Sequence, residues 1–207
     1  NYDSSDLGKF DGIFRHSKVL GLIDNTNKAI LSNSTNVTLA QKFTPTLNAA
    51  TTYNINFNNK LYNPHTDHNK TAGGIIASTG FKISGDGTNV HFFDDDGNGN
   101  LRLYYISAGA RNYANETIGT ITYSDGSISI GSLNITSVED VDGAGSTQIR
   151  ITAIPDSKDI VPVRNQLLEI DFVNTTISGG IDTITVGDTT AGATYTTTSS
   201  YTTTSSY

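Results

Sequence analysis

Hydrophobic and polar residues alternate along several short stretches of the chain, which is the pattern of β-strands with one buried face. The clearest case spans residues 90–105, where apolar residues flank the Asp-, Asn- and Gly-rich segment Asp94–Asn100. Gly and Asn accept the positive φ angles that tight turns need, so this stretch predicts a β-hairpin. A second hairpin is predicted over residues 121–130, with its turn at Ser124–Ser127.

The alternation recurs elsewhere, and further strands are predicted at Val37–Phe43, Tyr53–Phe57, Ile149–Ala153 and Leu168–Phe172. The apolar run Val19–Ile23 predicts another strand, with Ala29–Leu31 as its hairpin partner. For the last part an alternative stays open, namely a short helix over Val163–Leu168 with Pro162 in its first turn. No long stretch repeats apolar residues at helical spacing, so little helix is expected.

These patterns predict a mainly β protein in which antiparallel hairpins form a sandwich-like domain over residues 1–173. A polar loop suggests a division into two small subdomains near residue 63. Residues 174–207 form a polar tail rich in Thr, Ser and Tyr, with a six-residue repeat that begins at Tyr195. Such a segment buries too little apolar surface to offset about 1–2 kcal/mol of backbone entropy per residue. We therefore expect the tail to lie extended against another subunit.

Composition narrows the classes of partner. The net charge of −7 disfavours a nucleic acid or an anionic membrane as the main partner. No apolar run approaches the roughly 20 residues that a membrane-spanning helix needs. Cysteine is absent, which excludes disulfides and thiolate sites. Methionine is absent too, even at residue 1, so the chain is expected to begin inside a longer protein.

Two segments carry residue types that bind metals. Asp94–Asn100 places oxygen donors as in the first half of a calcium loop, but Tyr105 stands where a bidentate Glu would be needed. His65, Asp67 and His68 are close enough in sequence for part of a transition-metal site. A hairpin turn and a solvated loop explain the two segments better. We therefore predict no metal site and no cofactor.

Catalytic signals are also weak. No Gly-x-Ser-x-Gly motif is present, and neither His16 nor His91 has sequence neighbours that suggest a triad. The sequence thus predicts no catalytic residue and no enzyme. Three tyrosines could line a carbohydrate-binding face or, more often for such residues, the edge of a core: Tyr104, Tyr105 and Tyr113.

The order of segments between Leu101 and Asp171 resembles a known family. These segments are Leu101–Tyr105, Ile118–Gly126, Ile149–Pro155 and Asp159–Asp171, and the last contains Arg164-Asn165-Gln166 before Ile170-Asp171. They are similar to the C-terminal half of the baseplate wedge protein of contractile-tailed, T-even-like bacteriophages, in the baseplate J-like group. Weaker similarity extends back through Ile23-Asp24 and Phe43–Pro45, and the tail resembles that of marine relatives.

The resemblance implies a structural virion protein that is located in the tail baseplate and assembled in the host cytoplasm. It implies homodimers that link into a ring and contact other wedge subunits, with no nucleic acid or membrane partner. It supplies no catalytic or cofactor residues. The alternative is a tail-fibre or adhesin module that binds host-surface glycan, which clustered exposed aromatics would favour.

Overall fold

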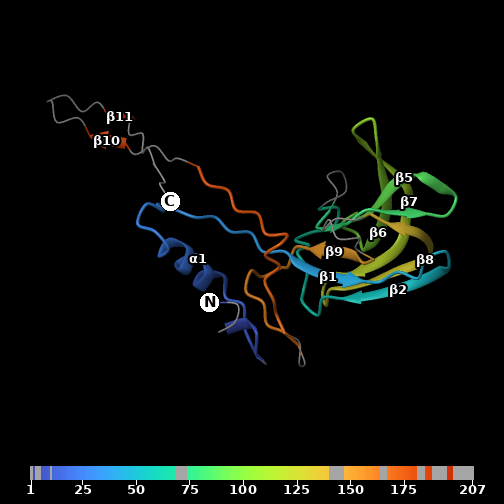
Figure 1. The fold of residues 1–207 in the computed structure, drawn as a ribbon, viewed down its shortest axis with the longest axis horizontal. Coiled ribbons are helices and arrows are strands. Elements are labelled where there is room, and N and C mark those ends of the chain that lie inside the picture. The colour runs from blue at the N-terminus through green and yellow to red at the C-terminus, as the bar shows by residue number, and fades with distance from the viewer. Residues whose placement is uncertain are drawn as a thin grey trace.

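The computed structural model describes residues 2, 6–9, 11–68, 74–139, 147–163, 167–180, 185–187 and 195–197. The fold is mainly β, as the alternation predicted, and its strands pair antiparallel throughout the described residues. Figure 1 shows a curved β unit on one side and a thinner region that carries the helix α1 on the other.

The helix α1 spans His16–Asp24, and the strands follow it in this order: β1 (Leu39–Phe43), β2 (Ala50–Asn56), β3 (Ile76–Ser78), β4 (Phe81–Ile83), β5 (Asp86–Asp95), β6 (Asn100–Ser107), β7 (Ala110–Thr122), β8 (Ser127–Val138), β9 (Ile149–Ala153), β10 (Thr185–Gly187) and β11 (Tyr195–Thr197).

The larger sheet closes on itself through its longest strands. Strands β4, β5, β6, β7 and β8 pair in sequence, and β8 then pairs with both β7 and β4. The first half of β8 lies beside β7, where Ile121 faces Ile128, and its far end lies beside β4, where Phe81 faces Val138. The result is a five-stranded, barrel-like sheet, and β2 is added alongside the first half of β8.

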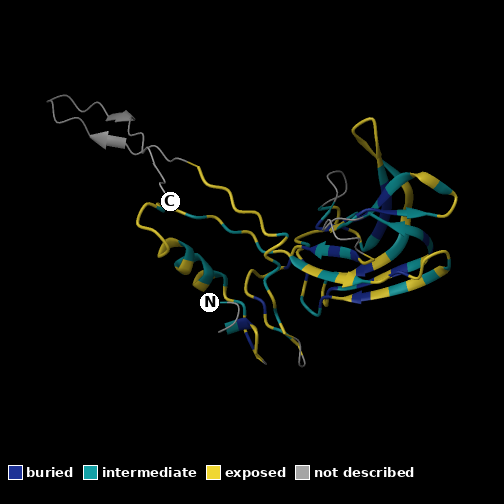
Figure 2. Ribbon diagram, viewed as in Figure 1, coloured by how far each residue is buried: buried dark blue, intermediate teal, exposed yellow. Residues whose placement is uncertain are grey.

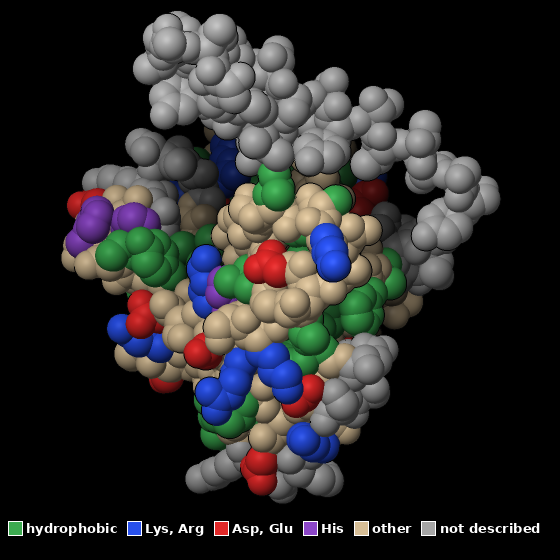
Figure 3. Space-filling view, turned by 90° about the vertical axis from the view of Figure 1, so that its left-hand side faces the viewer, with side chains coloured by type: hydrophobic (Ala, Val, Ile, Leu, Met, Phe, Trp, Pro, Cys, Tyr) green, Lys and Arg blue, Asp and Glu red, His purple; other side chains and the backbone are tan. Residues whose placement is uncertain are grey.

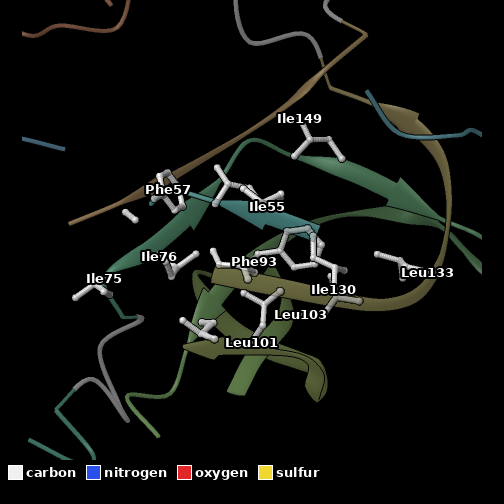
Figure 4. Packing of buried hydrophobic residues seen from close by; sticks show 14 of the residues in the cluster. Ile55, Phe57, Ile75, Ile76, Phe93, Leu101, Leu103, Ile130, Leu133 and Ile149 are labelled. Atoms are coloured by element: carbon white, nitrogen blue, oxygen red, sulfur yellow. The ribbon is translucent and has the colours of Figure 1, made fainter. Parts of the chain in front are cut away.

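A second sheet, in the order β1-β9-β3, shares one hydrophobic core with the barrel. Alternate strand residues point inward, so Ile149, Ile151 and Ala153 of β9 are fully buried. Figure 4 shows apolar side chains from both sheets meeting in this core. Its members come from both sides of residue 63, since Phe57 and Ile76 belong to the same cluster.

Both predicted hairpins are confirmed. Strands β5 and β6 are joined at residues 96–99, where Gly97 and Gly99 have φ angles of 75° and 96°. Strands β7 and β8 are joined by a four-residue turn at 123–126, and Gly126 has φ 76°. The turn chemistry read from the sequence therefore located both connections.

The strand predicted at Val19–Ile23 is wrong, because these residues lie in α1. His16, Val19, Leu20 and Ile23 are the partly buried side chains of this helix, and their spacing of three and four residues places them on one face. The run was too short for its period to be read from apolar residues alone. Its predicted hairpin partner, Ala29–Leu31, forms a turn and coil instead.

The final strand predicted at Leu168–Phe172 is also wrong. Residues 167–171 have no regular structure, although Leu168 and Ile170 are half-buried while Leu167 and Glu169 are exposed. Burial still alternates along this segment, but no strand in the described part of the chain pairs with it. The alternative helix over Val163–Leu168 is not present in its described residues, and residues 164–166 lie outside the described part of the chain.

Residues 6–38 and 157–180 come together as a region that we call the lobe, apart from the barrel unit formed by residues 39–156 (Figure 1). The amide of Phe14 donates to the carbonyl of Ile160 at 2.9 Å, and the amide of Ile160 donates back to Phe14 at 2.9 Å. The His16 amide also donates to Asp159 Oδ1 at 2.8 Å. Two segments that are far apart in sequence therefore form one structural region.

Candidate functional site

The strongest polar cluster lies on the outer face of β5, β6 and β7, around Asp94. Asp94 is only 1% exposed, although strand alternation places it on the face away from the barrel core. The Nε of Arg102 donates to Asp94 Oδ1 at 2.9 Å, and Nη1 of Arg111 donates to Oδ2 at 2.6 Å. Tyr113 donates its hydroxyl to Oδ2 at 3.1 Å. One carboxylate thus ties together three strands.

Two aromatic rings complete this cluster and cover its charges. The guanidinium carbon of Arg102 lies over the ring of Tyr113, 4.3 Å from its centroid. The guanidinium carbon of Arg111 lies over the ring of Tyr104, 4.5 Å from its centroid. Burial raises the pKa of the Tyr104 and Tyr113 hydroxyls. Both tyrosine hydroxyls therefore stay protonated at physiological pH.

This arrangement joins three strands through charge-assisted hydrogen bonds. Asp94 accepts from two cations and a phenol, while Nη2 of Arg102 donates to the carbonyl of Asp95 at 2.7 Å. Each side-chain oxygen of Asp94 is thus held by a guanidinium, and Arg111 is the most accessible charged group of the cluster.

The three tyrosines singled out from the sequence do not form one exposed platform. Tyr104 and Tyr113 lie together with their ring centroids 6.0 Å apart, but Tyr104 is buried. Tyr105 points to the other face of β6, where the centroid of its ring lies 5.6 Å from that of His91. The structure therefore assigns Tyr104 and Tyr113 to the Asp94 cluster.

The two histidines of the predicted loop do come together. The Nδ1 of His68 lies 3.1 Å from Nε2 of His65, and the rings are 4.8 Å apart. Asp67 is engaged elsewhere, because the side-chain amide of Asn98 donates to its Oδ1 at 2.6 Å. Across the described residues no group of three or more His, Cys, Asp or Glu side chains is arranged to hold a metal ion.

The carboxylates of the calcium-like turn point to three different places. Asp94 lies in the arginine cluster described above, and Asp95 accepts from the Ile76 amide at 2.9 Å and the Tyr123 hydroxyl at 2.8 Å. Asp96 accepts from the backbone amide of Asn98 at 2.7 Å. Each carboxylate has its own donors, so they do not surround a common centre.

One surface feature was missed because no single segment reveals it. The sequences Asn54-Ile55-Asn56, Thr120-Ile121-Thr122 and Ser127-Ile128-Ser129 lie side by side in register on β2, β7 and β8. Their isoleucines point into the core, and their polar residues line a shallow depression of about 320 Å³ on the outside. Three polar-Ile-polar triplets could have been noted in the sequence, but their register depends on the fold.

The lobe has a different surface from the barrel unit. Its exposed large apolar residues are Ile13, Leu22, Leu31, Val161, Val163, Leu167, Phe172, Val173 and Ile177, whereas the barrel unit exposes Leu47, Tyr62, Ile106 and Ile154. Figure 2 shows that buried residues are concentrated in the barrel unit and that most described residues of the lobe are exposed or partly buried. Figure 3 shows basic and acidic side chains interspersed on the face toward the viewer, so charge does not dominate that face.

Comparison with known proteins gives one family match. Residues 1–42 match the family described as baseplate structural protein gp6, C-terminal domain III. No curated protein matches the chain. The matched residues cover the first segment of the lobe and most of β1, and lie before the segments between Leu101 and Asp171 on which the main resemblance rested.

No helix among the described residues has the length and apolar content needed to cross a bilayer. The family match supports a structural component of a phage baseplate, associated with other baseplate subunits in the virion tail.

Proposed function

We propose that this chain is a wedge subunit of the baseplate of a contractile-tailed phage and works by self-association rather than by catalysis. The observation that carries the proposal is the apolar surface of the lobe, the region whose first segment matches a baseplate structural family. Phe172, Val173 and Ile177 are 62%, 80% and 92% exposed and are close together in sequence. Exposed apolar surface of this kind is typical of association sites.

The lobe is also poorly packed by itself. Leu7 and Ile160 are its fully buried large residues among those described, and neither belongs to the main core. Helix α1 has no fully buried residue and makes few contacts with any strand. Burying apolar surface yields about 25 cal/mol per Å², so a partner that covers this lobe would stabilise it as well as bind it.

In this proposal the lobes of two copies pair into a dimer, and dimers join other wedge subunits in a ring. The tail from residue 174 takes part by lying against another subunit. Thr and Tyr favour extended backbone, which suits an added strand. The paired strands β10 and β11 fit a segment that readily adopts extended structure.

The test is light scattering over a concentration series on the full chain and on two matched variants. The double variant Phe172→Ser/Val173→Ser removes apolar surface from the lobe, while Ile106→Ser/Ile154→Ser removes it from the barrel unit, where these residues are 57% and 44% exposed. We expect the lobe variant to weaken association at least about tenfold and the barrel variant to change it little.

A chain that stays monomeric at high concentration would contradict self-association through the lobe. Equal weakening by both variants would contradict the assignment of the surface. The glycan-binding alternative gains no support from the tyrosines, because Tyr104 is buried and Tyr105 faces away from Tyr113.

A further inference from the structure

The chain enters the barrel unit from the lobe and returns to the lobe at adjacent points. Strand β1 is the first strand after the lobe, and β9 is the last before the chain returns to it. The two strands are antiparallel partners, with Leu39 facing Ala153 and Phe43 facing Ile149. Facing Cα atoms in such a pair are about 4.5–5.5 Å apart. The chain thus passes between the lobe and the barrel unit at two neighbouring strand ends, and Nη1 of Arg150 in β9 also lies 3.5 Å from Asp171 Oδ2 in the lobe.

The lobe closes on itself across that junction. The reciprocal bonds between Phe14 and Ile160 join its two segments, and Lys158 Nζ donates to the carbonyl of Thr35 at 3.4 Å. The His16 ring nitrogen Nε2 also lies 2.9 Å from the Thr35 carbonyl oxygen. These contacts use residues on both sides of the barrel unit but none inside it.

The two regions also have separate buried residues. Every fully buried member of the main core lies between Ile55 and Ala153. Leu7 and Ile160, the buried apolar residues of the lobe, lie outside that cluster. Domain boundaries fall where few contacts cross and where the chain ends of a unit lie close together, and such units tolerate insertion into another fold.

We propose that residues 39–156 are an independently stable β-barrel module inserted into the lobe. The family match ends at residue 42, within β1 and a few residues beyond this boundary. The proposal does not depend on the baseplate role, since it concerns how the chain is divided.

The test is hydrogen exchange, followed by mass spectrometry, on the full chain and on two core variants. Ile130 is fully buried in the barrel, and Ile160 is almost fully buried in the lobe. We expect Ile130→Ala to speed exchange at least about tenfold in β2, β6 and β8 and to leave the lobe peptides within about twofold. Ile160→Ala is expected to do the reverse, with faster exchange around Phe14 and no change in the barrel.

If either variant speeds exchange in both regions, the two form one cooperative unit and the proposal is wrong. Unchanged exchange rates in the barrel peptides of Ile130→Ala would also overturn the proposal, because the barrel core would then not supply the stability of the module. Should Ile130→Ala unfold the barrel completely, protection that persists at Phe14 and Ile160 supports the proposal, and its loss contradicts it. Ile130→Val provides a milder version of the same comparison.

Discussion

Arg111 donates a 2.6 Å hydrogen bond to Asp94 from a partly exposed position, although Asp94 itself is 1% exposed. Because Arg102 holds the other carboxylate oxygen from a buried position, Asp94 is the shared partner of two cations. Its main role is therefore to keep β5, β6 and β7 together.

Replacing Asp94 by Ala should destabilise the protein by about 3–5 kcal/mol, since it removes the carboxylate from a buried guanidinium. Urea unfolding measures the loss. The double variant Asp94→Leu/Arg102→Leu should recover part of it, because the buried charge is removed together with its partner. A loss below about 1 kcal/mol for Asp94→Ala would mean that Arg102 is well solvated without it.

Gly126→Val should be more costly than Gly85→Val. Both glycines have positive φ, 76° and 89°, so both variants incur backbone strain of about 1–3 kcal/mol. A Cβ at Gly126 would also lie 2.3 Å from the carbonyl oxygen of Asn59, whereas nothing lies within 4 Å at Gly85. The difference between the melting temperatures of the two variants measures the cost of the close approach to Asn59, since both variants carry the backbone strain. Equal melting temperatures would show that the Asn59 loop moves aside freely.

His91 predicts a loss of stability in acid. The ring is fully buried, and neither ring nitrogen has a hydrogen-bond partner. Burial lowers the pKa of His91 below the usual 6.5, although Asp86, 3.5 Å away, opposes the shift. The imidazole therefore binds a proton more readily in the unfolded chain than in the folded one. The stability that the neutral His91 contributes is complete above pH 6.5, and it is lost as the pH falls toward the pKa of the folded state.

Urea unfolding between pH 7.5 and pH 5 checks this for the wild type and for His91→Leu. We expect the variant to have a flatter pH dependence over that range. The matched control is His65→Gln, in an exposed loop, which should keep the slope of the wild type. Identical slopes for all three proteins would remove His91 as the cause.

Calcium should not bind the Asp94–Asn100 turn. Asp94, Asp95 and Asp96 are each held by different donors and point apart. Titration calorimetry with millimolar calcium should give no saturable heat. A site of micromolar affinity would require these carboxylates to exchange their partners for the ion.

Deleting residues 174–207 should weaken self-association and leave residues 1–173 folded. The deleted segment is mostly polar, and among its described residues Ile177 is 92% exposed, so the core loses nothing. Light scattering and circular dichroism on both chains would measure the two effects. Unchanged association would exclude the tail from the interface.

The sequence located the parts of the fold that depend on local pattern. Strict alternation at Tyr53–Phe57 and Ile149–Ala153 matches β2 and β9, and the Gly and Asn residues of the two hairpins mark their turns. It failed at Val19–Ile23, because a run of only five residues fits either period and a polar residue, His16, completes the helical face. It failed at Leu168–Phe172 because alternation cannot supply a neighbouring strand.

By itself, then, the sequence determined the β class, the hairpins and the polar tail, since side-chain period and turn chemistry are properties of a few adjacent residues. Only the tertiary structure decided that Asp94 joins Arg102 and Arg111, that β8 closes a barrel, and that Phe14 meets Ile160. Those pairings join residues between 8 and about 150 positions apart in the chain. Their energies depend on the packing of the whole core, which no local pattern encodes.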